Sequence, residues 1–296
     1  MQQLNKPIII VGTGRCGSTL LHRLLALHEN VGWLSPYNEV LPEQSWLSRF
    51  SNLYRWQPLG HMVRHLRFFP KPFESYRFWE HYLPGFSRRD RPLTAADVPT
   101  EAIEPVRRAV SRVLAHQGRS RLLVKVTGWA RVAYFNRIFP EAQFIWLNRE
   151  HRAVVSSWVR AGWLDVTSPP DSNTWQWGQP PAEYEALWQE LGGGPLLAAA
   201  LKIQLDLDDI RHNLAHFPTR AMQVQFEELI TRPEETLRTI CDFCGLPWTS
   251  GFARAVGTRE FYDPTDKWKR FLSEEDGQRV LAFFERAEQL RPVHHG

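Results

Sequence analysis

The chain has 296 residues, of which 43% are hydrophobic and 23% charged, a composition typical of a globular protein with a large buried core. Its net charge of +4 is small and its basic residues are spread along the sequence, which argues against general nucleic-acid binding and is compatible with a site for a small anion. The N-terminal apolar run is too short for a signal peptide or a membrane span, and no later run is long enough, so we expect a soluble, cytoplasmic protein.

Four short apolar runs are typical of buried strands. They lie at residues 8–11, 122–126, 144–147 and 222–226. Helix-like stretches lie at residues 18–28, 131–139, 151–160 and 234–244. This alternation predicts an α/β fold with a central parallel sheet flanked by helices. No linker or repeat interrupts the sequence, so we expect a single domain over residues 1–296.

The turn after the first predicted strand has the features of a phosphate-binding loop. Gly12 and Gly17 have the spacing of a Walker A motif, in which backbone amides at a helix start converge on an anion. Ser18 replaces the lysine of nucleoside triphosphatases, and Arg15 supplies a cation within the loop, which favours a smaller anion bound without metal. The sequence therefore predicts a P-loop-like, three-layer fold.

Two other interpretations of this turn stay open. With Gly14, the glycines also fit the dinucleotide-binding pattern. That fold, however, has an acidic residue at the end of a second strand soon after the first helix, and this residue is missing here. A glycine-rich turn can also serve only to close the chain.

Two stretches lie outside the strand–helix alternation. The first lies between the first two predicted strands and is rich in Trp, Phe, Pro and Arg; we expect it to cover the carboxyl edge of the sheet, where α/β proteins bind ligands. Its densest basic run, Arg88, Arg89 and Arg91, is expected to be a solvated loop. Residues 167–181 are rich in Pro and Ser and form a candidate mobile flap.

The cysteines do not predict a metal site. Cys241 and Cys244 fall within a predicted helix, and no second Cys/His pair lies at ligand spacing. We expect buried thiols there.

Four segments in the same order resemble the PAPS-dependent sulfotransferases, particularly their bacterial and tyrosylprotein-type branch. They read GTGRCGSTLLHRLLALHENV, RIFPEAQFIWLNREHRAVVSSW, QVQFEELITRPEETLRTICDFCGLP and TDKWKRFLSEE. The resemblance implies transfer of a sulfuryl group from 3'-phosphoadenosine-5'-phosphosulfate (PAPS), with release of 3'-phosphoadenosine-5'-phosphate (PAP). The acceptor would be a hydroxyl or an amine on a small molecule or a glycan.

The resemblance also assigns the donor-binding residues. The 5'-phosphosulfate loop corresponds to Arg15, Cys16, Gly17, Ser18 and Thr19. The 3'-phosphate would be held by Arg149 and Ser157, and the closing loop would contribute Lys267 and Trp268. Ser156 is adjacent to Ser157, but the family spacing favours the latter. Arg149 alone is also compatible with a surface ion pair to Glu150 or Glu141. The sequence departs from the family at Phe226, where a tyrosine is usual.

For the chemistry, the resemblance implies that Arg15 stabilises the leaving group with help from Lys125 at a strand end. The histidine that follows this lysine in small-molecule sulfotransferases is absent. Other branches of the family use a glutamate about twenty residues after the loop arginine, so the resemblance implies that Glu39 is the general base, with Glu80, His81 and Glu43 as alternatives.

Two rival functions remain at this stage. A P-loop kinase or nucleotide hydrolase would need a loop lysine and a magnesium-binding aspartate at a strand end, which the predicted strand ends lack. A catalytically dead PAP-binding protein would share the donor site.

Overall fold

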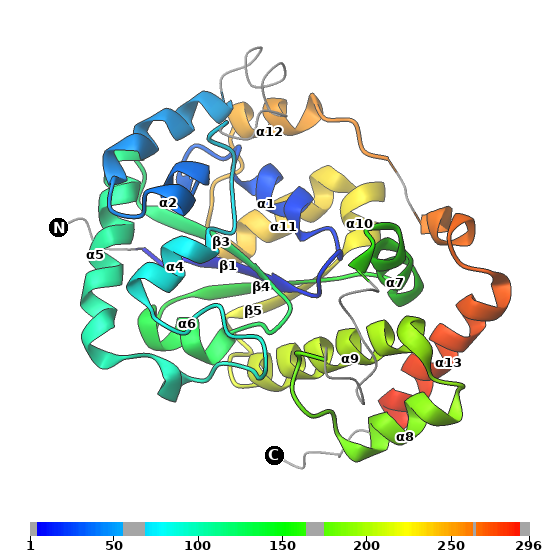
Figure 1. Cartoon of the computed structure of the whole chain (residues 1–296). Helices are drawn as coiled ribbons and strands as arrows, with labels where there is room; N and C mark the ends of the chain where they lie inside the picture. Colours follow the sequence, from blue (N-terminus) through cyan, green and yellow to red (C-terminus); the bar gives the residue numbers. More distant parts are fainter. Residues whose placement is uncertain (1–4, 56–68, 164–174, 263–264, 291–296) are drawn as a thin grey trace.

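The computed structural model describes residues 5–55, 69–163, 175–262 and 265–290. A five-stranded parallel sheet with strand order β2-β3-β1-β4-β5 runs through its centre (Figure 1). Its strands are β1 (Ile8–Gly12), β2 (Val31–Trp33), β3 (Arg121–Thr127), β4 (Gln143–Asn148) and β5 (Ala221–Gln225). The four predicted strands are confirmed, each within about one residue of its expected ends, which is the precision to which strand and helix ends are defined.

Strand β2 (Val31–Trp33) was not among the predicted strands. This strand has only three residues and contains Gly32, so its apolar pattern is too short to recognise. The side chain of Gln117 fixes it: Trp33 N donates to Gln117 Oε1 at 3.1 Å, and Gln117 Nε2 donates to Trp33 O at 2.7 Å. Leu34 and Ser35 follow the strand, so the acidic residue of a dinucleotide-binding fold is also missing at the true second strand end.

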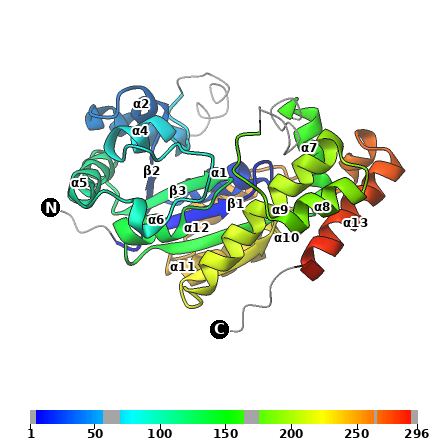
Figure 2. The same ribbon diagram turned by 60° about the horizontal axis from the view of Figure 1, so that its bottom comes forward.

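Helices lie on both faces of the sheet (Figures 1 and 2). They are α1 (Ser18–Leu25), α2 (Pro36–Val40), α4 (Tyr76–Tyr82), α5 (Thr100–Gln117), α6 (Val132–Ile138), α7 (His151–Arg160), α8 (Ala182–Glu190), α9 (Gly194–Ala215), α10 (Phe226–Thr231), α11 (Pro233–Cys244), α12 (Ser250–Gly257) and α13 (Glu274–Leu290). Short 3-10 helices add η1 (Ser45–Arg55), η2 (Ala95–Asp97) and η4 (Thr265–Arg270). The helices predicted at 131–139, 151–160 and 234–244 are confirmed, whereas the first helix ends at Leu25.

The residues of β1 alternate between two buried cores. Ile8 and Ile10 belong to the cluster that includes α1, α11 and α12, while Ile9 and Val11 belong to the cluster that includes α5, α6, α9 and α13. All four side chains are fully buried. Because successive side chains of a strand point to opposite faces, an uninterrupted apolar strand requires cover on both sides. The predicted three-layer α/β fold is thereby confirmed.

The chain reverses its direction across the sheet at β1. It reaches β2 and β3 on one side and then β4 and β5 on the other. The loops after β1 and β4 therefore leave in different directions, which is the point where open α/β sheets bind ligands. The phosphate loop and Arg149 follow these two strands.

Several smaller expectations can be compared with the structure. Cys241 and Cys244 are buried free thiols on α11, as expected, and burial raises the pKa of each to about 12. In the candidate flap at 167–181, residues 167–174 lie outside the described residues. No helix within the described ranges is long and apolar enough to cross a lipid bilayer.

Candidate active site

The loop from Gly12 to Gly17 joins β1 to the start of α1, as predicted. Gly17 has φ of +95°, and a Cβ at this position would lie 2.3 Å from the Phe226 ring. Gly12 is equally constrained, since a Cβ there would lie 2.7 Å from Cys16 Sγ and 2.8 Å from Leu147 O. Both positions therefore require glycine. The loop holds the first amides of α1, which have no partner within the helix, at the carboxyl edge of the sheet.

Arg15 connects this loop to α7. Its backbone is left-handed, with φ of +70°, and its Nε donates to Ser157 Oγ at 3.1 Å. Arg149 Nη1 donates to the carbonyl oxygen of Arg15 at 3.2 Å. Burial, together with the charge of Arg160, lowers the pKa of Arg15. The two arginines and Ser157, which are distant in sequence, thus form one connected group.

A small cavity of about 200 Å³ lies beside this group. Its lining includes Arg149, Ser157, Arg160, Lys267 and Trp268. Arg149 lies 4.5 Å from the ring centroid of Phe226, so the residue that replaces the usual tyrosine packs under the guanidinium. Burial lowers the pKa of Arg149, against the opposing charge of Glu227. The residues that line this cavity include three basic side chains and none that is acidic, which suits a phosphate.

Trp268 is the buried wall of the small cavity, at 5% exposure. It packs on Gly277 of α13, where a Cβ would lie 2.6 Å from the ring. The guanidinium of Arg152 lies 4.5 Å from the ring centroid of Trp268. The four residues that the resemblance assigned to the 3'-phosphate region and the closing loop therefore line one cavity. Their roles as donor ligands stay predictions.

Lys125 links the phosphate loop to a carboxylate that the sequence analysis missed. Its Nζ donates to Thr19 Oγ1 at 2.9 Å and pairs with Glu74 Oε1 at 2.6 Å. Thr127 Oγ1 donates to the same Glu74 oxygen at 3.2 Å. In the described part of the chain both contacts fall on Oε1, so Oε2 is the oxygen open to an incoming group. Glu74 also lines the larger cavity described below.

Glu39, the expected base, is not among the residues that contact Lys125. Its carboxylate accepts from the Arg77 amide at 3.0 Å and does not line either of the cavities described here. Burial raises the pKa of Glu39, the Arg77 amide and guanidinium oppose this shift, and the charge of Glu74 adds to it. Glu39 therefore neighbours Glu74 electrostatically, but it is Glu74 that contacts Lys125. The role of Glu39 as base stays a prediction that the geometry does not favour.

The alternative bases are engaged elsewhere. Glu80 accepts the amides of Gly85 and Ser87 at 2.8 and 2.7 Å. Although burial acts in the opposite direction, these donors lower its pKa. His81 pairs with Glu43 at 3.3 Å between two solvent-exposed side chains. These contacts fix local structure, and none of the three lines either cavity described here.

A larger cavity of about 400 Å³ has Gly14 of the loop and Glu74 in its lining. Four tryptophans line it: Trp129, Trp158, Trp163 and Trp177. Trp158 Nε1 donates to Gly14 O at 3.0 Å, which joins the aromatic wall to the loop. These four tryptophans follow the insertion between the first two predicted strands, and the insertion contributes one aromatic side chain, Tyr76, to the lining.

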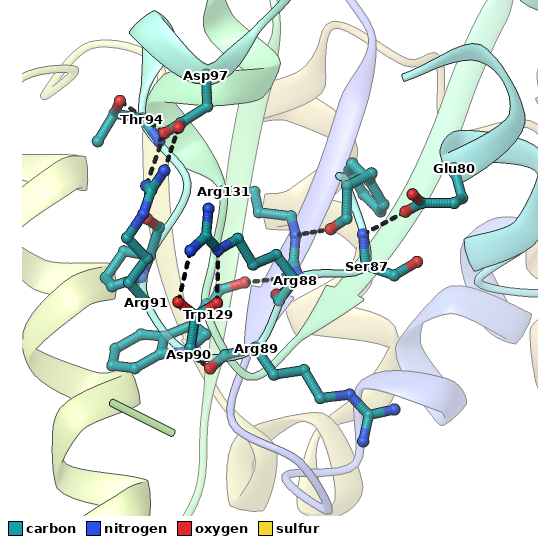
Figure 3. A network of polar contacts seen from close by, with 12 residues as sticks. Glu80, Ser87, Arg88, Arg89, Asp90, Arg91, Thr94, Asp97, Trp129 and Arg131 are labelled. Carbon is teal, nitrogen blue, oxygen red and sulfur yellow. Dashed lines mark hydrogen bonds and ion pairs between the residues drawn. The ribbon is translucent and has the colours of Figure 1, made fainter. Parts of the chain in front are cut away.

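The insertion also supplies the polar residues Glu74, Ser87 and Arg89 to the lining of this cavity, and Figure 3 shows the polar network around Ser87 and Arg89. Arg131 donates to the carbonyl oxygens of Phe86, Arg88 and Trp129 at 3.1, 3.0 and 2.7 Å. Trp129 Nε1 in turn donates to Arg89 O at 2.7 Å. This network holds the loop that brings Ser87 and Arg89 to the cavity.

The basic run on that loop is partly neutralised. Arg88 pairs with Asp90 at 2.6 Å, and Arg91 pairs with Asp97. The solvated loop expected there is confirmed for Arg88 and Arg89, which are exposed, while Arg91 is half-buried (Figure 3).

Comparisons with known proteins identify the family and support the fold. Residues 7–250 match the family model described as "Sulfotransferase family". A sulfotransferase of Mycobacterium tuberculosis H37Rv has a TM-score of 0.58 and 17% identity, with 95% of this chain and 78% of that chain covered. One from Mycobacterium avium has a TM-score of 0.57 and 14% identity over 96% and 76%.

The sulfotransferase domain of the Synechococcus PCC 7002 olefin synthase has a TM-score of 0.51 and 17% identity over 96% of both chains. At these identities the similarity supports the fold alone. No curated protein matches the sequence. The comparisons support the family, and they give no support to the tyrosylprotein-type branch.

Proposed function

The chain belongs to the sulfotransferase family, and from this premise we propose that it transfers a sulfuryl group from PAPS to a hydroxyl or amine of an acceptor. One observation carries the proposal: Arg15, Arg149 and Ser157 form a connected group beside a cavity that Lys267 and Trp268 complete. A basic cavity next to a phosphate loop suits a ligand with two separate phosphate groups. PAPS has this form.

In the proposed complex, the small cavity takes the 3'-phosphate. Arg149 offers a guanidinium fork, Ser157 a hydroxyl and Lys267 an ammonium group. Trp268 offers a ring face for the adenine. The loop amides and Arg15 take the 5'-phosphosulfate, so that the sulfuryl group faces the larger cavity, which Gly14 also lines.

The chemistry is an in-line displacement at sulfur. Glu74 Oε2 accepts the proton of the acceptor hydroxyl, the acceptor oxygen forms its bond to sulfur, and the bond from sulfur to the 5'-phosphate oxygen breaks. The electron pair of that bond leaves with the phosphate of PAP, whose added charge Lys125, Arg15 and the loop amides stabilise. Lys125 contacts both Thr19 of the loop and Glu74, so one cation positions the base relative to the loop.

The first test is donor binding followed by transfer. We expect calorimetry to detect PAP binding, and radiolabelled PAPS to label at least one member of a panel of phenols, alcohols, amines and glycans. Absence of PAP binding by the folded protein would refute the proposal. PAP binding without transfer to any acceptor would point to the catalytically dead alternative.

The second test separates the two candidate bases on whichever acceptor the panel identifies. With saturating PAPS, Glu74→Gln is expected to lower kcat by roughly 10²- to 10⁴-fold, the contribution typical of a general base. Glu39→Gln is expected to change kcat by less than about tenfold, since its carboxylate reaches the site only through its field on Glu74. A larger loss of kcat for Glu39→Gln than for Glu74→Gln would identify Glu39 as the general base. The location in the cytoplasm stays a prediction.

A further inference from the structure

A buried ion pair forms part of the lining of the larger cavity. Lys202 and Asp206 lie one turn apart on α9, and each side chain is only 1% exposed. Lys202 Nζ contacts Asp206 Oδ1. Burial lowers the pKa of Lys202 and raises that of Asp206, and their mutual attraction opposes both shifts. An ion pair is costly to bury and adds little stability by itself, so its position in a ligand cavity needs another reason.

The aromatic wall surrounds this pair. Lys202 Nζ lies 4.2 Å from the ring centroid of Trp129 and 4.8 Å from that of Trp177. Gly128 approaches the carboxylate closely enough that a Cβ there would lie 4.0 Å from Asp206 Oδ1. The pair is therefore fixed among rings at the edge of the strand that carries Lys125 and Thr127.

Two polar atoms of these cavity-lining residues have no partner within the described part of the chain. Asp206 Oδ2 is a buried acceptor, and Trp177 Nε1 is a buried donor. Both residues line the same cavity. An unsatisfied buried polar group costs about 1–3 kcal/mol, so such atoms are expected to meet a ligand or water. A hydroxyl group both donates and accepts, so it offers the donor that Asp206 Oδ2 lacks and the acceptor that Trp177 Nε1 lacks.

The charges favour a neutral hydroxyl over an ammonium group. Lys202 and Arg131 both act on Asp206, and either cation would repel a second one. The tryptophan faces favour a ring beside the hydroxyl. Resting on the proposed function, we infer that the acceptor is a ring compound with a second hydroxyl besides the one that is sulfated. Asp206 Oδ2 and Trp177 Nε1 bind this second hydroxyl.

Rigid aromatic diols test the inference by direct binding. We would titrate hydroquinone, a naphthalene diol and a biphenyl diol, each beside its monomethyl ether, into the protein saturated with PAP. An ether oxygen accepts from Trp177 Nε1 but donates nothing to Asp206 Oδ2, so the ratio of the two Kd values reports on the carboxylate. We expect at least one diol to bind about tenfold more tightly than its ether, as for a hydrogen bond to a charged group.

The paired variant Lys202→Met with Asp206→Leu replaces both charges with apolar groups of similar size, a change that proteins often tolerate. It is expected to bring the diol-to-ether ratio close to unity. Trp177→Phe keeps one aromatic ring but removes the N–H together with the five-membered part of the indole, and is expected to weaken diol and ether alike while the ratio persists. Asp208→Asn is the matched control: Asp208 lies on the same helix, accepts from Tyr184 Oη at 2.7 Å, and does not line this cavity.

Equal binding of diols and ethers by the wild type would overturn the inference, as would a ratio that the paired variant leaves unchanged. If the paired variant does not fold, the wild-type ratio and Trp177→Phe still decide. Failure of the proposed function is visible separately, because it appears as absent sulfuryl transfer or absent PAP binding. Turnover of single-hydroxyl phenols without any preference for diols would support the proposed sulfotransferase function and refute the inferred site for a second hydroxyl.

Discussion

The contribution of Arg149 to donor binding can be worked out from its contacts. Its guanidinium lines the small cavity, lies over the Phe226 ring at 4.5 Å and donates to Arg15 O at 3.2 Å. Arg149→Ala removes a charged donor from the 3'-phosphate and one support of the loop. A hydrogen bond to a charged group contributes about 1.5–3 kcal/mol. We expect PAP to bind roughly 30- to 150-fold more weakly, which corresponds to about 2–3 kcal/mol.

Comparing PAP with a nucleotide that lacks the 3'-phosphate tests whether Arg149 acts on that phosphate. Adenosine 5'-phosphate lacks the 3'-phosphate, so Arg149→Ala is expected to weaken it by less than about threefold, through the loop contact alone. Calorimetric titration of both nucleotides into both proteins gives the four Kd values. Arg149→Lys retains the charge without the fork and is expected to fall between wild type and alanine. Arg112→Ala, at an exposed position of α5, controls for loss of positive charge.

An unchanged Kd for PAP in a folded Arg149→Ala protein would refute this reasoning. So would an equal loss for both nucleotides, because the arginine would then act on the loop and not on the 3'-phosphate.

Three further predictions address the loop, the metal question and a buried carboxyl. Gly17→Ala places a Cβ 2.3 Å from the Phe226 ring at a φ of +95°, and is expected to lower the unfolding free energy by about 1–3 kcal/mol in denaturant titration. In the Phe226→Ala background, which is itself less stable because a core ring is lost, the additional cost of Gly17→Ala should be smaller but not zero, since the backbone strain remains. Excess EDTA is expected to leave sulfuryl transfer unchanged, whereas a magnesium-dependent kinase would lose its activity. Burial raises the pKa of Asp209 to about 6, so its contribution to stability is present below its unfolded pKa and is lost as the pH rises toward 6. Asp209→Asn is therefore expected to gain stability relative to wild type by about 2 kcal/mol between pH 4 and 7, and a difference that is flat with pH would contradict the assignment.

The fold was readable from the sequence where the pattern is local and long enough. An apolar run at 8–11 that is buried on both faces, followed by glycines and a helix, leaves few alternatives. Three residues around Gly32 carry no such pattern, and β2 is fixed by the side chain of Gln117 from a distant helix. Contacts of that kind have no signature in a single sequence.

The candidate site likewise contains residues that a local sequence pattern indicates and residues that only a tertiary contact brings in. The resemblance singled out Arg15, Arg149 and Ser157 because each lies at a recognisable strand end or helix, and the structure brings the three together, while their roles as donor ligands stay predictions. Glu74 could not be predicted, since it precedes α4 in a segment without periodicity and reaches Lys125 only in the folded chain. Sequence distance from Arg15 pointed to Glu39 instead.

The larger cavity shows why composition alone does not locate a binding site. The chain has thirteen tryptophans, and some of these rings pack into the core: Trp33 and Trp79 are fully buried. The cavity tryptophans come from the strand end, α7 and the chain before α8. Which rings face a ligand depends on the tertiary arrangement and not on local abundance.

The bonds that join Arg149, Arg15 and Ser157 make the two halves of the donor site mechanically dependent on each other. A nucleotide that fills only one half engages side chains whose positions the other half also sets, so the free energies of two separate fragments will not sum to that of the intact donor. Truncated donors would thus bind with lower affinity, and their sulfur would also be less accurately positioned relative to the acceptor. In the proposed complex, discrimination among nucleotides would therefore depend on the whole connected group, with Arg149 contributing through the 3'-phosphate.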